Sequence, residues 1–397
     1  MVPNRLIDSH IHIGAEERID DLRAYVRALN LSMVGLLSLP TAGVGAEGDR
    51  TVNFNPEVLA AAAAVRHDDP MCRVVAYGSL DNRALLRLDG LSPSDWDPAA
   101  QVRELAAAGF TGLKLWEGKP DLQAALGISL DDDRLLGCYR EAGSLGMPVL
   151  VHVADPPLFW EATDTPWSYR DRPVPSFEEL LRQAAAIAAA IPTTWFIFPH
   201  LLFLAADLPR LDEFLRVAPN VWVDLAPGNY LYPALGGVPV SPTGRDLPAA
   251  ERNVEKAREF FTRRRDRILM GSDAFLFSRG SSVLPGTSLE ENMERYLRLH
   301  RFLTTDAWFG SPYANTPDRP MIAGLSLAPE VAEAVLSENG QRLCGADAAA
   351  APTPARSPEF GAAADYLDAW ARGPRGRTDE AEQRAGAART RIMEASR

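Results

Sequence analysis

The sequence predicts a (β/α)8 barrel, because short apolar runs alternate with segments of helical periodicity eight times along the chain. This alternation is typical of parallel strands joined by crossover helices, and eight such pairs over about 300 residues match the size of a closed barrel. The predicted strands lie at residues 7–13, 32–39, 72–79, 111–117, 148–153, 194–199, 221–225 and 267–272. An open, doubly wound sheet built from the same units is the alternative.

A segment of helical periodicity follows each predicted strand. Asp97 and Ser176 are typical N-terminal caps, since their side chains accept hydrogen bonds from the first turn, and Gly109 and Gly146 are typical stops. The predicted helices lie at residues 19–30, 55–68, 97–108, 131–146, 176–191, 207–218, 250–265 and 288–303.

Three connections that follow predicted strands are too long for simple turns, at residues 154–175, 226–249 and 274–287. In a barrel, the loops that follow strands gather at the catalytic face. The first of them contains several aromatic residues and two arginines. It is therefore interpreted as a substrate lid, with a surface insertion that packs on itself as the alternative.

The composition divides the chain into a barrel at residues 1–345 and a tail at 346–397 that is rich in Ala, Pro and Arg. Such a segment, with hardly an apolar face, is expected to be poorly ordered or loosely helical. Residues 366–370 are expected to dock somewhere, and the fold is expected to include an extra C-terminal helix.

The overall charge favours a small molecule as the partner. The chain of 397 residues has 41 Lys and Arg against 53 Asp and Glu, a net charge of −12, which argues against nucleic acid or a membrane surface. No apolar secretory segment is present at the start, so we expect a cytoplasmic protein, with a homodimer as a possible assembly. Cys72, Cys138 and Cys344 are too few and too scattered for a disulfide framework.

Four of the six histidines lie at the ends of predicted strands. His10 and His12 are two residues apart, so a strand places both imidazoles on one face. His152 and His200 end the fifth and sixth strands, and Asp273 ends the eighth. A lone strand histidine is usually a core residue, but five such positions at one end of a barrel predict a site for zinc or a similar divalent ion.

These motifs resemble the amidohydrolase superfamily, in the branch related to aminocarboxymuconate semialdehyde decarboxylase. The resemblance spans residues 5–345, and it rests on His10-Ile11-His12, residues 109–114, residues 148–152, Pro199-His200, Gly271-Ser272-Asp273 and residues 339–343. It implies one divalent metal ion held by His10, His12, His152 and Asp273, with His200 facing the bound water or the substrate. Zinc is the first expectation for this ion, with manganese, iron, nickel and cobalt as alternatives.

The charge of such an ion indicates the chemistry. A divalent cation brings the pKa of bound water to ~7 and polarises a carbonyl, with Asp273 as the proton carrier and His200 as a hydrogen-bonding partner of the carbonyl. We therefore expect a hydrolase that cleaves an amide, lactone or related carbonyl bond. The alternative is a non-oxidative decarboxylase that uses an unsaturated or aromatic carboxylate on the same metal site.

Lys114, on the fourth predicted strand, has two interpretations. In two-metal members of the superfamily a carboxylated lysine there bridges the ions, whereas a plain cation could contact substrate or pair with Asp8 or Glu117. Position after a strand also predicts a substrate-facing wall, which comprises Trp116, Asp155, Phe203, Tyr230, Phe275 and Arg279. Arg279 could bind a substrate carboxylate through two parallel hydrogen bonds.

Overall fold

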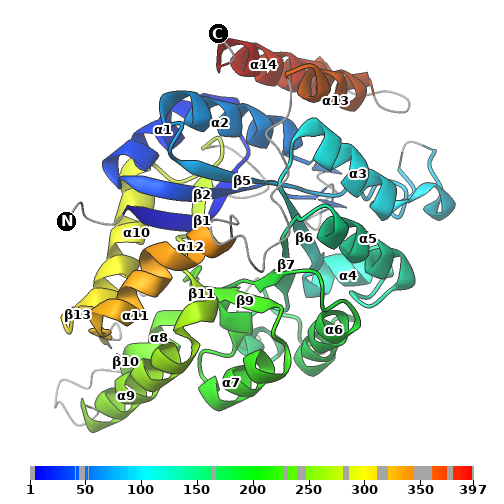
Figure 1. Cartoon of the computed structure of the whole chain (residues 1–397). Helices are drawn as coiled ribbons and strands as arrows, with labels where there is room; N and C mark the ends of the chain where they lie inside the picture. Colours follow the sequence, from blue (N-terminus) through cyan, green and yellow to red (C-terminus); the bar gives the residue numbers. More distant parts are fainter. Residues whose placement is uncertain are drawn as a thin grey trace.

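Parallel strands form the centre of the molecule, and helices surround them (Figure 1). The computed structural model describes residues 5–40, 42–43, 50–51, 53–88, 90–161, 167–227, 231–238, 247–279, 286–310, 321–343, 360–372 and 379–395. The strands of the central sheet are β1 (Leu6–Ile13), β2 (Leu31–Leu37), β5 (Arg73–Gly78), β6 (Gly112–Gly118), β7 (Val149–Val153), β8 (Phe196–Phe198), β9 (Val221–Asp224), β11 (Ile268–Leu269) and β12 (Ala274–Leu276).

The sheet closes through its eighth strand, which is divided into two short pieces. β11 pairs with β9 and β12 pairs with β1, so both ends of the sheet belong to one segment, residues 268–276. Between the two pieces, the backbone N–H of Ser9 donates to the carbonyl of Met270 over 2.8 Å. A sheet whose first and last strands are parts of one segment is a barrel. The predicted (β/α)8 fold is confirmed, and the open sheet is excluded.

The helices that follow the strands cover the outside of the barrel (Figure 1). They are α1 (Ile19–Ala28), α2 (Asn55–Asp68), α3 (Pro98–Ala108), α5 (Asp133–Ser144), α6 (Phe177–Ala190), α7 (Leu208–Val217), α9 (Leu247–Arg264) and α10 (Leu289–Thr304). Asp97 and Ser176 cap α3 and α6, as expected. Gly109 ends α3 at a φ of 103°, a conformation that favours glycine, and Gly146 follows α5 at 69°.

Shorter elements occupy the connections. They are η1 (Glu16–Arg18), β3 (Ala42–Gly43), β4 (Arg50–Thr51), η2 (Pro93–Asp95), α4 (Pro120–Leu126), η3 (Pro157–Trp160), η4 (His200–Phe203), α8 (Leu231–Gly236), β10 (Gly237–Val238), η5 (Arg265–Arg267), β13 (Trp308–Gly310), β14 (Met321–Ala323), α11 (Pro329–Glu333), η6 (Ala334–Glu338) and α12 (Asn339–Leu343). The connection expected at 274–287 begins later, because β12 continues the eighth strand. None of the described helices combines the length and apolar character needed to cross a bilayer.

Both faces of the barrel sheet are buried. Every residue of β6, β7, β8 and β9 is buried, because helices cover the outer face and side chains fill the interior. The polar exceptions within these strands and β1 include His10, His12, Lys114, His152 and Asp224. Buried polar groups are costly unless they are paired or bind a ligand, so these residues indicate a functional interior.

Two helices near the end of the chain, α13 (Phe360–Arg372) and α14 (Asp379–Ala395), pack on the outside of α2 and α3 (Figure 1). Trp370 donates to Asn53 over 2.8 Å, and Arg384 binds the buried Glu57 through two hydrogen bonds. We call this pair of helices the C-terminal hairpin. Docking near residues 366–370 as an extra C-terminal helix was expected, but a second helix, α14, packs beside it, and a few large side chains between alanines make the contact. The separation of the chain at residue 345 stays a prediction.

Candidate metal centre

β1 brings two imidazoles into the barrel. His10 and His12 are both buried, and their Nε2 atoms lie 3.1 Å apart. The eighth strand passes close behind them: a Cβ atom added at Gly271 would lie 2.8 Å from the Cβ atom of His10. Only glycine therefore allows this approach without displacement of β1.

Asp273 lies in the gap between β11 and β12, not at the end of a continuous strand as the sequence suggested. Its φ of 57° is left-handed, which costs a non-glycine residue about 1–2 kcal/mol. The change of conformation interrupts the ladder and places Asp273 Oδ1 3.4 Å from His10 Nε2 and 3.6 Å from His12 Nε2. Among the described residues, these three side chains form the one candidate metal group, with ligand atoms all within 4.8 Å of one another.

Asp224, the last residue of β9, orients His10. Its Oδ2 lies 2.7 Å from His10 Nδ1. Burial by itself would raise the pKa of Asp224, but the neighbouring His10 and His200 and a backbone N–H hold this pKa at about 2. An ionised carboxylate only accepts hydrogen bonds, so Nδ1 of His10 donates. In the neutral imidazole, Nε2 of His10 then carries a lone pair directed at His12 and Asp273.

The close approach of these three atoms requires a proton or a cation between them. Burial, followed by the charges of His10 and Lys114, lowers the pKa of His12 well below its ordinary value, so His12 is neutral. Its Nδ1 has no hydrogen-bond partner among the described residues. With its proton on Nε2, His12 donates to His10 Nε2 over 3.1 Å, whereas with its proton on Nδ1 the two Nε2 lone pairs face each other. In the second tautomer, these atoms and Asp273 Oδ1 are acceptors at 3.1–3.6 Å, which repel one another unless a cation lies between them. Two imidazoles and a carboxylate fit a divalent metal ion.

His200 lies beside this group, in a turn of unusual conformation. The four residues of η4, from His200 to Phe203, all have a left-handed backbone, with φ between 51° and 58°. His200 Nδ1 lies 2.9 Å from the carbonyl of Ala226, so Nδ1 donates. Burial lowers the pKa of His200. The imidazole is therefore neutral, and its Nε2 is an acceptor. Its ring centroid lies 5.7 Å from that of His10.

His152, at the end of β7, does not join the converging ligand atoms. Its Nε2 lies 3.3 Å from Asp155 Oδ1, and its ring centroid lies 5.2 Å from that of His200. Burial lowers the pKa of His152 to about 4. His152 is thus a neutral side chain at the rim of the group, and its expected role as a metal ligand stays a prediction.

Asp155 is engaged by protein atoms. Lys119 Nζ lies 2.5 Å from Asp155 Oδ2, and the Tyr169 hydroxyl donates to the same oxygen. Burial would raise the pKa of Asp155, but the Lys119 charge and His152 hold it well below its usual range. Asp155 therefore supports His152. The sequence analysis expected Asp155 only to contact substrate, and that contact stays a prediction.

Lys114 points into the barrel without a hydrogen-bond partner among the described residues. Burial lowers its pKa to about 8, although the carboxylates of Asp224 and Asp273 act in the opposite direction. The suggested pairing with Asp8 is wrong. The Asp8 carboxylate accepts hydrogen bonds from Tyr25 and Ser272.

Aromatic wall residues lie against the imidazoles. Phe275 stacks on His12 with centroids 5.5 Å apart, and Phe203 stacks on His200 with centroids 4.9 Å apart. Trp116 contacts His152 edge-on at 6.2 Å. Three of the predicted wall positions are thus adjacent to the site, whereas Tyr230 lies outside the described residues.

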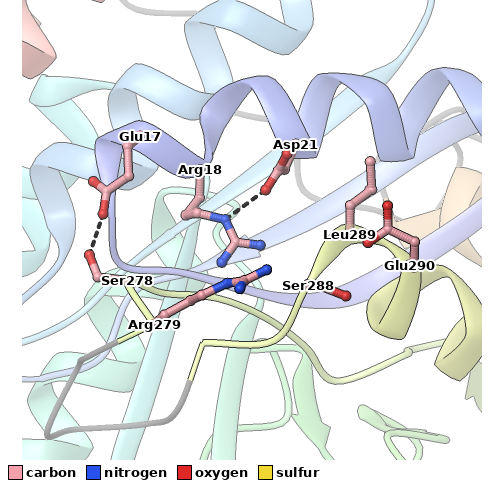
Figure 2. Close-up of a pocket in the computed structure, with 8 residues that line it drawn as sticks. All are labelled: Glu17, Arg18, Asp21, Ser278, Arg279, Ser288, Leu289 and Glu290. Atoms are coloured by element: carbon pink, nitrogen blue, oxygen red, sulfur yellow. Dashed lines mark hydrogen bonds and ion pairs between the residues drawn. The ribbon is translucent and has the colours of Figure 1, made fainter.

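Arg279 is exposed and lines a different pocket, of about 410 Å³, between the start of α1 and the start of α10 (Figure 2). The other lining residues are Glu17, Arg18, Asp21, Ser278, Ser288, Leu289 and Glu290. None of them is a predicted metal ligand, so the structure does not place Arg279 with the metal group.

Asp224 is the main residue that the sequence analysis missed. It ends the apolar run Val221-Trp222-Val223, which is the same position that drew attention to the strand histidines. A search for polar residues at the ends of all the predicted strands, and not only for histidines, would therefore have identified Asp224.

Comparison with known proteins gives the family. The amidohydrolase family model matches residues 7–346, so this chain belongs to the amidohydrolase family of metal-dependent enzymes. Comparison with curated proteins finds no match.

Several solved structures are similar to this chain at low identity. An uncharacterised TIM-barrel protein from Bordetella bronchiseptica is 15% identical, with a TM-score of 0.47 over 85% of this chain and 97% of that one. A putative amidohydrolase from Staphylococcus aureus is 14% identical, with a TM-score of 0.46 over 86% of this chain and 99% of that one. A 5-carboxyvanillate decarboxylase from Novosphingobium aromaticivorans, complexed with manganese, is 12% identical, with a TM-score of 0.46 over 86% of this chain and 96% of that one.

Proposed function

We propose that this protein is a metal-dependent hydrolase that cleaves an amide, lactone or related carbonyl bond of a small molecule. The observation that carries the proposal is the convergence of His10 Nε2, His12 Nε2 and Asp273 Oδ1, with a neutral His200 beside them. Membership of the amidohydrolase family supports an enzyme of this kind.

His10, His12 and Asp273 would hold the ion, with His152 as a fourth ligand. Zinc is the first candidate, and manganese, iron, nickel and cobalt are the others, because imidazole and carboxylate ligands suit all of them. When bound, a divalent cation supplies Lewis-acid polarisation of a carbonyl and a lower pKa for water.

Side chains of the site carry out the proton transfers. Asp273 accepts the proton of the attacking water and delivers it to the leaving group. His200 Nε2 is an acceptor, because its Nδ1 donates to Ala226, so His200 orients the water. It would need to be protonated to donate to the substrate carbonyl, and burial disfavours that form. Lys114 is the nearby cation that would stabilise negative charge on the substrate.

The test begins with the metal content of protein purified without added metal. We expect about one divalent ion per chain, lost in His10→Ala and retained in the control His300→Asn, which alters a histidine of α10. Two ions per chain would contradict the single-ion site and favour a carboxylated Lys114.

A screen of lactones, amides and unsaturated carboxylates in ¹⁸O-labelled water then tests the reaction. Hydrolysis must place solvent oxygen in the product acid, whereas decarboxylation releases carbon dioxide and takes up a solvent proton. Release of carbon dioxide without the label would overturn the hydrolase proposal and leave the metal site intact.

A further inference from the structure

Arg295 of α10 contacts the backbone of a proposed metal ligand. Its Nη1 donates to the carbonyl oxygen of Asp273 over 3.1 Å. Asp273 is the residue whose left-handed conformation, with a φ of 57°, interrupts the eighth strand. The hydrogen bond therefore stabilises the conformation that directs the Asp273 carboxylate into the barrel.

The same guanidinium also packs on an aromatic ring that contacts a second proposed ligand, His12. It lies 5.1 Å from the ring centroid of Phe275. The Phe275 ring is in turn stacked on the His12 imidazole, with an interplanar angle of 9°. Arginine suits this double contact because its planar group can donate in its plane and stack through its face.

A neighbouring residue of α10 fixes the strand between these contacts. Asn292 lies one helical turn before Arg295 and is fully buried. Its Oδ1 accepts from the Phe275 N–H over 3.1 Å and from the Thr287 hydroxyl over 2.7 Å. The backbone of Phe275 is thus held by Asn292, which leaves Arg295 to act on the Asp273 carbonyl and the Phe275 ring.

We propose that Arg295 is a positioning residue of the metal centre. It holds Asp273 in its left-handed conformation and Phe275 against His12, so that two of the three ligands are oriented before the ion binds. This inference rests on the proposed metal site, and it assigns Arg295 no contact with the ion or the substrate.

The test is a cobalt(II) titration of the full chain, followed by visible absorption, with chelator competition to obtain the affinity. Arg295→Gln should weaken cobalt binding about 10-fold, as expected for a residue that orients a ligand, and should change the absorption bands of the bound ion. Arg295→Lys keeps the charge and can still donate to the Asp273 carbonyl but lacks the planar face, so it should recover part of the affinity. Arg298→Gln is the control, since Arg298 lies on the same helix and pairs with Glu294.

Wild-type affinity and an unchanged spectrum in Arg295→Gln would overturn the inference. Absence of cobalt binding by the wild-type protein would instead overturn the metal site itself, which separates the two failures. If Arg295→Gln does not fold, Phe275→Leu removes the ring that links the guanidinium to His12. An unchanged cobalt spectrum in that variant would also count against the proposal.

Discussion

Asp224 supports two imidazoles with one buried carboxylate. Its Oδ2 accepts from His10 Nδ1 over 2.7 Å, and its Oδ1 accepts from the backbone N–H groups of His200 and Ala226, each over 3.0 Å. All of these partners are donors, and each oxygen of the carboxylate is an acceptor, so every one of these hydrogen bonds can form at once. This arrangement fixes the tautomer of His10 and the start of the turn that carries His200.

Asp224→Asn should therefore weaken metal binding by about 10-fold to 100-fold. An asparagine has one acceptor and one donor, so its amide group would face either His10 Nδ1 or the two backbone N–H groups unfavourably. Chelator competition measures the affinity, and Asp306→Asn, at an exposed position, is the control. Equal affinities for Asp224→Asn and the wild type would show that His10 does not need this partner.

Glu117 is a buried acid on β6 whose protonation should affect stability. Burial raises its pKa above the ordinary value of 4.5, although a hydrogen bond from Asn82 acts against this. Because the folded state holds the proton more tightly, the group's contribution to stability is fully present below pH 4.5. It is lost as the pH rises through the raised pKa.

Glu117→Gln should remove this loss, so the variant should gain stability relative to the wild type as the pH rises from 4.5 through the raised pKa of Glu117. Asn82 Oδ1 is buried without a partner among the described residues, so a rotated Asn82 amide can accept from the new glutamine. Urea unfolding at several pH values checks the expectation. Glu104→Gln, which alters an exposed residue of α3, is the control. Parallel pH profiles for Glu117→Gln and the wild type would contradict it.

At the scale of elements, two departures from regular structure build the site. The gap between β11 and β12 turns Asp273 inward, and the left-handed turn η4 places His200 and Phe203. The first interrupts the eighth strand between its two pieces, and the second follows the end of β8. Left-handed residues of this kind persist only where the surrounding packing determines them, and the buried side chains of η4 provide that packing.

In the described part of the loop after β7, Tyr169 and Asp155 connect the loop to the site. Tyr169 donates to Asp155, which contacts His152, and the Tyr169 ring packs against Phe159 and Trp160. Lys119 reaches the same carboxylate. This contact is consistent with the interpretation of residues 154–175 as a lid.

Tyr169→Phe should keep the ring packing and lose the hydrogen bond, so the loop should open more readily, by about 1 kcal/mol. Faster amide exchange at residues 156–161 and 167–175, with unchanged exchange in α5, is the expected result. Arg170→Gln, an exposed change in the same loop, should leave the exchange as it is. Equal protection in Tyr169→Phe and the wild type would mean that the hydroxyl does not hold the loop.

At the scale of the whole molecule, the C-terminal hairpin joins the last described residues to the start of α2. Arg384 binds Glu57 over 2.6 and 2.9 Å and lies over the rings of Phe54 and Trp370. The Glu57 side chain is only 4% exposed, and Arg384 is the cation that pairs with it there.

Arg384→Met should therefore destabilise the protein by about 3 kcal/mol, because it leaves a buried carboxylate unpaired. Adding Glu57→Gln to this variant should recover much of the loss. Arg389→Gln is the control, since its pair with Asp368 is exposed and worth about 0–1 kcal/mol. Denaturant unfolding measures the wild type, these three variants and Glu57→Gln alone, and purely additive changes would contradict a coupled buried pair.

The pattern of apolar residues was sufficient to predict the order of the barrel elements and most of their limits. Periodicity predicted seven strands and eight helices close to their observed bounds and the eighth strand as one piece, because the spacing of apolar residues follows directly from which face of each element is buried. It also placed His10 and His12 on one face, since that depends only on the two-residue repeat of a strand. Local chemistry likewise gave the caps of α3 and α6.

The way in which these elements form a site could not be read from the pattern of residues. The division of the eighth strand, the tautomers of His10 and His200, and the support from Asp224 and Arg295 depend on contacts between residues far apart in the chain. The docking of the C-terminal hairpin is of the same kind. The periodicity of apolar residues indicates which side of an element is buried, but not which other element packs against that side. The divided strand, the tautomers and the docked hairpin all depend on that second element.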